Sequence, residues 1–140
     1  MANADPNSAS REDSPLRIVM EFEGDRSKLP LADRAVDGFS EKIAGRPLPY
    51  ATLMYIFAEK IPVGTIVPNP HTRRIQMVVV DNGAGLRKWT TLSRNVREDF
   101  KRAFGEEPGV VTAIGVLTDT DNTGGSVEAW YGDMRFSAQQ

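Results

Sequence analysis

The residues whose types and spacing could do chemistry gather in a polar run at positions 118–125. Asp119, Asp121 and Asn122 bring side-chain oxygens into this run, and Asp133 follows in the next segment. Hard cations such as Ca²⁺ bind oxygen ligands, so Asp119, Asp121 and Asp133 form a candidate calcium site. Two other interpretations stay open: a loop that contacts a polar ligand, and a plain turn whose side chains bond to nearby backbone groups.

The polar run matches the start of an EF-hand loop only in outline. The fifth position holds Thr123, and the twelfth holds Trp130 where that loop needs a bidentate glutamate. A strand pattern follows the run, whereas an EF-hand continues into a helix. The run therefore does not fit an EF-hand, and a calcium site of another kind stays open.

Trp130 and Tyr131 suggest contact with a sugar, because aromatic rings pack on sugar rings. Adjacent strand residues point to opposite faces, so only one of the two can face a given ligand. Trp130 shares its face with Met134 and Phe136, which predicts a core position. Tyr131 shares its face with Asp133 and is the candidate ligand contact.

The composition argues against most catalytic and nucleic-acid-binding classes. The chain has no cysteine and one histidine, His71, which excludes thiolate sites, multi-histidine metal sites and a histidine-paired relay. Glu21 and Glu23 share one strand face, an arrangement common on exposed strands, so we do not favour an enzyme built on them. The formal net charge of -2 predicts no attraction to nucleic acid or acidic membranes, and no apolar run is long enough for a membrane helix.

The elements that must position these residues are mostly strands. Alternating or continuous apolar patterns predict strands at residues 16–23, 50–58, 63–67, 73–80, 110–118 and 127–136. The strand at 50–58 is apolar on both faces, which is typical of a central strand.

Two short helices are expected between the strands. The first spans residues 31–44, and Gly45 follows it in the position of a C-terminal cap. Its buried stripe is expected to consist of Leu31, Ala35, Phe39 and Ile43. The second spans residues 96–104, with Asn95 as its N-cap.

Strands and helices do not alternate regularly along the chain, so a doubly wound parallel sheet is not expected. We predict an all-β domain with two short helices, built as an antiparallel β-sandwich. Residues 1–14 are expected to form a disordered leader, residues 15–137 the single domain and residues 138–140 a tail.

Several segments resemble a bacterial family of unknown function, number 3047 in the domain-of-unknown-function series. The similar segments are residues 16–25, 62–65, 68–69, 94–108, 118–124, 129–133 and 135–136, together with Trp89. The run Thr-Asp-Thr-Asp-Asn-Thr at 118–123 is quite specific. The resemblance covers roughly residues 11–136 and is interpreted as the C-terminal two-thirds of the family's domain.

The resemblance implies a galactose-binding-like jelly-roll sandwich and brings no established activity. Members usually carry further β-rich sequence upstream of the segment that matches Leu16, often behind an export signal that would direct them to the periplasm. We therefore expect a sandwich that is incomplete on its N-terminal side, and the compartment stays open.

Together these features favour a non-catalytic module that binds a polar small molecule or glycan at residues 119–125, with calcium as a candidate cofactor. The alternative is a structural or assembly module whose open sheet edge pairs with another chain. Residues 16–22 present an apolar stripe that needs an opposing layer, so we also expect self-association.

Overall fold

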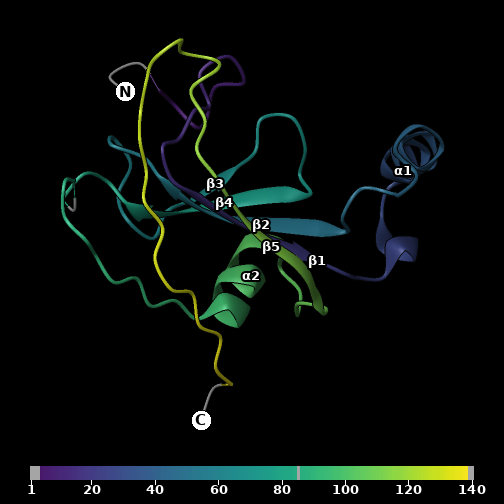
Figure 1. The fold of residues 1–140 in the computed structure, drawn as a ribbon. Coiled ribbons are helices and arrows are strands. Elements are labelled where there is room, and N and C mark those ends of the chain that lie inside the picture. The colour runs from purple at the N-terminus through teal and green to yellow at the C-terminus, as the bar shows by residue number, and fades with distance from the viewer. Residues whose placement is uncertain (1–3, 85, 139–140) are drawn as a thin grey trace.

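A single mixed sheet of five strands forms the body of the protein (Figure 1). The computed structural model describes residues 4–84 and 86–138. The strand order is β3-β4-β2-β1-β5. The strands are β1 (Arg17–Phe22), β2 (Ala51–Phe57), β3 (Ile66–Pro68), β4 (Ile75–Asp81) and β5 (Val111–Leu117).

The pairing within the sheet is mixed. β1 pairs antiparallel with both β2 and β5, and β3 pairs antiparallel with β4, but β2 and β4 run parallel. The central position of β2 confirms what its two apolar faces predicted. The purely antiparallel pairing that we predicted is wrong, because the chain between β2 and β4 contributes β3 at the far edge and returns to β2 in the same direction. The described residues form one sheet, and a second sheet that would complete a sandwich is not among them.

Helix α2 (Val96–Phe104) covers one face of the sheet. Phe100 is fully buried, and its ring centroid lies 4.6 Å from that of Phe22 on β1. Asn95 caps the helix as predicted, since its side chain accepts a hydrogen bond from Glu98 N at 3.1 Å. Gly105 ends the helix with a φ of 76°, in the left-handed region that glycine adopts without strain.

Helix α1 (Leu31–Ala44) has the predicted bounds but projects away from the sheet (Figure 1). Leu31 and Ala35 of its expected buried stripe are exposed, and the other two side chains of that stripe lie outside the described residues. Among the described side chains, Asp37 attaches the helix, since its carboxylate pairs with Arg74 at 2.8 Å and with Arg26 at 2.6 Å. Arg26 begins a short 3-10 helix, η1 (Arg26–Lys28).

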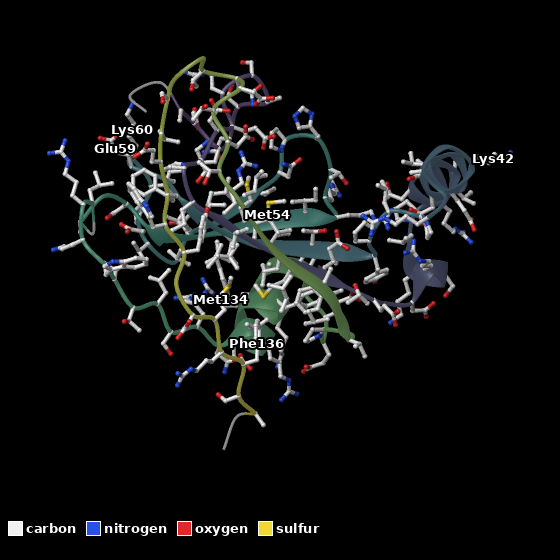
Figure 2. All side chains as sticks on the ribbon, in the orientation of Figure 1. Lys42, Met54, Glu59, Lys60, Met134 and Phe136 are labelled. Carbon is white, nitrogen blue, oxygen red and sulfur yellow. The ribbon has the colours of Figure 1, made fainter. Side chains whose placement is uncertain are left out.

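The last predicted strand, residues 127–136, does not form. This segment runs extended past α2 without joining the sheet (Figure 1). Trp130, which we expected in the core, is 71% exposed, and Met134 and Phe136 are also exposed on the tail (Figure 2). Adjacent side chains of the tail still point to opposite faces, but Tyr131, not Trp130, is on the face turned toward the sheet. The side chain that finds hydrogen-bond partners on the sheet therefore determines which face of the tail points inward.

Candidate functional site

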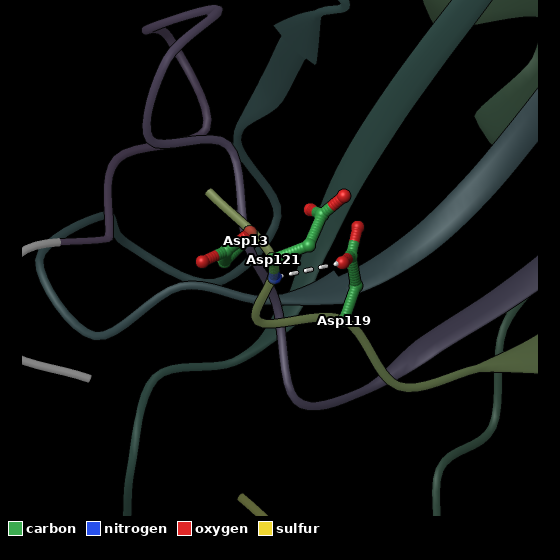
Figure 3. A group of neighbouring side chains, drawn as sticks. All are labelled: Asp13, Asp119 and Asp121. Carbon is green, nitrogen blue, oxygen red and sulfur yellow. Dashed lines mark hydrogen bonds between the residues drawn. The ribbon is translucent and has the colours of Figure 1, made fainter. Parts of the chain in front are cut away.

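The structure gathers three carboxylates at the turn after β5 (Figure 3). Oxygens of Asp13, Asp119 and Asp121 lie within 4.8 Å of one another. Asp13 precedes β1 and the other two follow β5, so the antiparallel pairing of β1 with β5 brings them together. Asp119 N also donates a hydrogen bond to Ser14 O at 3.1 Å.

Asp13 fastens the turn to the start of the sheet. Its side chain is 2% exposed and accepts hydrogen bonds from Asn122 N at 3.1 Å and from Thr123 N at 2.7 Å. The hydroxyl of Thr123 donates a third bond. Burial alone would raise the pKa of Asp13, but the hydrogen bonds from Thr123 and Asn122 outweigh it and lower the pKa below its ordinary value. Asp13 is therefore an ionised clamp for this turn.

The other two carboxylates have neighbours of opposite charge: Asp119 pairs with an arginine, whereas Asp121 lies next to further carboxylates. Asp119 lies 3.2 Å from the Arg17 guanidinium and also accepts a bond from Asp121 N at 3.4 Å (Figure 3). The hydrogen bond and the charge of Asp119, together with burial and the charge of Asp13, raise the pKa of Asp121. Of the three carboxylates, the Arg17 guanidinium pairs with Asp119, so the field of Asp119 and Asp13 at Asp121 stays negative.

Arg17 holds the cluster from the side of the sheet. It is 4% exposed, and its Nη2 donates to Glu12 O. Its Nε has no partner among the described residues. A buried guanidinium at this place already neutralises part of the negative charge that a bound cation would otherwise meet.

The structure sorts the predicted site residues into two groups. Asp119, Asp121 and Asn122 lie in one turn, whereas Asp133 lies exposed on the tail and is not part of the carboxylate group. Tyr131 donates a hydrogen bond to Leu117 O at 2.9 Å and accepts one from Arg17 N at 3.3 Å. Its hydroxyl is thus engaged by the ends of β5 and β1.

Asp13 is the site residue that the sequence interpretation missed, because it fell in the expected leader. Both Asp13 and Ser14 are buried, and Ser14 Oγ donates to Leu16 O at 2.8 Å. The available signal was an acidic residue directly before the first strand. This residue could be assigned to the site only by knowing that β1 and β5 are neighbours in the sheet.

A second feature is the outer edge of β5. All seven of its residues are exposed, and it has no neighbouring strand on that side among the described residues. Asp119 N bonds to Ser14 O before β1, and Leu117 O bonds to the same Tyr131 hydroxyl as Arg17 N, so both backbone groups point toward β1. Backbone groups alternate along an antiparallel ladder, so those of Ile114 and Val116 point to the open side.

Of the two best-formed hollows among the described residues, the one beside the carboxylates is lined by Asp13 and has a volume of only about 10 Å³. The other has a volume of about 150 Å³ and lies near the N-terminal segment, between Asp5, Arg11 and residues 58–61. Pockets for small molecules usually measure at least roughly 300 Å³. The turn after β5 is a surface feature.

The buried carboxylate of Asp99 links α2 to the sheet. It accepts hydrogen bonds from the Tyr55 hydroxyl at 2.9 Å and from Arg94 at 2.6 and 2.9 Å. Burial and the adjacent Asp99 raise the pKa of Tyr55 well above its ordinary value. Tyr55, Arg94 and Asp99 thus form a neutral hydroxyl and an ion pair that hold α2 against the sheet, which is a structural role.

These observations define a small mixed-sheet domain with a carboxylate-fastened turn and one open strand edge. The family model of the proteins of unknown function DUF3047 matches residues 1–135, so the chain belongs to this family. The match reaches further toward the N-terminus than the resemblance noted above. No curated protein and no solved structure matches the chain. Among the described residues, neither helix has the length and apolar character to cross a membrane.

Proposed function

We propose that this domain is an assembly module that accepts a strand from another chain along the outer edge of β5. The single observation that carries the proposal is that β5 is long, uncharged and exposed along all seven residues. Unpaired N–H and C=O groups on such an edge favour the addition of a further strand.

The contrast between the two edges of the sheet supports this function. The opposite edge strand, β3, has three residues and ends in Pro68, which cannot donate a ladder hydrogen bond. β5 has neither a charged residue nor a proline. Proteins usually protect their sheet edges by short strands, charges, proline or bulges. β5 has one such irregularity, at Thr112, where its register against β1 shifts, and the rest of the strand carries none of these devices.

Amide hydrogen exchange at high dilution tests the proposal directly. The amides of Ile114 and Val116 should exchange rapidly, whereas amides that face β1 should be protected. A lysine-flanked peptide of alternating threonine and valine should then slow exchange at these two positions. Full protection of both amides in the dilute protein without peptide would mean that the edge is closed, and the proposal would fail.

We also propose that the assembled domain is a jelly-roll sandwich of the galactose-binding type. It requires a second sheet packed face to face against the first. A strand that pairs along the edge of β5 would extend the first sheet, so the second layer would have to come from a further part of the partner.

The carboxylate turn carries a second candidate function, which is calcium-dependent binding of a polar ligand or glycan. The observation that favours it is the proximity of Asp13, Asp119 and Asp121 within 4.8 Å. The raised pKa of Asp121 marks a site where a cation would relieve repulsion.

A calcium titration separates this candidate from a purely structural turn. Millimolar Ca²⁺ should raise the melting temperature, because a ligand that binds only the folded state stabilises it by RT ln(1 + [L]/Kd). Asp121→Asn should abolish the rise, since Asp121 lies outside the Asp13 clamp, and Asp133→Asn should leave it unchanged. An identical melting curve in calcium and in chelator would exclude the site.

A further inference from the structure

We infer that the strand accepted by β5 is the β5 of a second copy of this chain, paired antiparallel about a twofold axis at Ile114. This inference rests on the proposed function, since it names the partner of the same edge. Two five-stranded sheets would join into one continuous sheet, and each copy would close the open edge of the other.

The backbone geometry suits this arrangement. Ile114 is the central residue of β5, and its backbone groups point to the open side. Two such residues facing each other would exchange both hydrogen bonds, as a hydrogen-bonded pair does in an antiparallel ladder. Val116 would then lie opposite Thr112 of the second copy, the position at which β5 shifts register against its own β1.

The charge pattern of β5 also suits pairing with itself. A twofold axis places equivalent residues opposite or near each other, so a charged residue close to the axis would meet its own charge. No residue of β5 is charged, and the pairs formed about Ile114 are all uncharged. A strand of this composition meets no repulsion from its own copy.

The exposed area limits the size of the contact. Val110, Val111, Ile114, Val116 and Leu117 are all among the exposed large hydrophobic residues. A stable interface buries roughly 800 Å² on each partner, and one strand with half-exposed side chains offers only part of that. We therefore expect a small interface and a dimer that dissociates on dilution.

The protein's own tail does not take this place. Residues 127–136 have a strand pattern, but Tyr131 ties them to Leu117 O at the end of β5, and they continue past α2. The open side of β5 before Leu117, at Ile114 and Val116, thus stays free for a second chain.

Opposite charges at the twofold axis provide the decisive experiment. Ile114→Lys and Ile114→Glu should each be monomeric, because each would place like charges opposite each other. An equimolar mixture should regain the dimer, because Lys would then face Glu. Ile114 is 44% exposed, so both variants are expected to fold. Val36→Lys is the matched control, because Val36 is 51% exposed on α1, away from the edge.

Sedimentation equilibrium from about 1 µM to about 1 mM gives the readout. The average mass of the wild type and of Val36→Lys should rise from that of one chain to that of two. Wild type that stays monomeric throughout, while its Ile114 and Val116 amides exchange freely, would overturn the second copy as partner and leave the open edge intact. Assembly beyond two copies, or a mixture that stays monomeric although both variants are folded, would overturn the twofold pairing.

Discussion

The hydroxyl of Tyr131 joins the tail to two other parts of the chain, the start of β1 and the end of β5. It contacts Leu117 at the end of β5, Arg17 at the start of β1 and the hydroxyl of Thr118 at 3.3 Å. Adjacent Trp130 points outward and is 71% exposed. The two neighbours therefore differ in what they contribute to stability, and the polar one contributes more.

We predict that Tyr131→Phe lowers the free energy of unfolding by about 1 kcal/mol, because one hydroxyl with several partners is lost. Trp130→Ala should change it by less than about 0.5 kcal/mol, as exposed positions usually do. Urea unfolding of the two variants measures both values. A larger loss for Trp130→Ala would show that the tail packs with its other face inward.

At the scale of elements, the described side chains attach α1 to the rest of the protein through one carboxylate. Asp37 pairs with Arg74 and Arg26. Arg74 also donates to the carbonyl groups of Tyr50 and Pro49, so it fixes the chain between α1 and β2. The same ion-pair group thus attaches the helix and the entry to the central strand.

We predict that Asp37→Ala destabilises the protein by about 3–5 kcal/mol, because it leaves the buried Arg74 without its anion. Asp33→Ala removes the same charge from the first turn of α1 and should cost less than about 1 kcal/mol. Urea unfolding gives the free energies, and limited proteolysis between residues 25 and 50 reports the release of α1. Equal effects of the two substitutions would contradict an attachment through Asp37.

At the scale of the whole molecule, buried carboxylates govern the response to acid. Hydrogen bonds and nearby arginines lower the pKa of Asp37 despite the opposing effect of burial, and Thr123 and Asn122 do the same for Asp13. The unfolded chain therefore binds protons on these groups at a higher pH than the folded chain does. Their stabilisation is present above the ordinary aspartate pKa of 3.8 and is lost as the pH falls through the folded values.

We predict that the free energy of unfolding is nearly constant above about pH 6 and decreases as the pH falls from about 5 toward 3. Asp121 acts in the opposite direction, because its raised pKa favours the folded state at low pH, but its exposure weakens the effect. Urea unfolding across this range is the measurement. Asp13→Asn should flatten the acid limb, and a wild-type stability that increases toward pH 3 would contradict the assignment.

Local sequence patterns determined the elements themselves. Both helices have the predicted bounds, because Asn95, Gly45 and Gly105 act on backbone groups within a few residues. The first five predicted strands all form within a few residues of their expected limits, since alternation and apolar runs are also local signals.

Only the tertiary structure decided how the elements meet. The parallel pairing of β2 with β4 depends on the path of the chain through β3, which no local pattern encodes. The tail has a strand pattern, yet Tyr131 finds its partners on the ends of β1 and β5, and no ladder forms. Asp13 joined Asp119 and Asp121 only because β1 and β5 became neighbours. Contacts between residues more than a hundred positions apart depend on the whole packing arrangement, and for that reason the sequence determined the candidate turn but not the residue that fastens it.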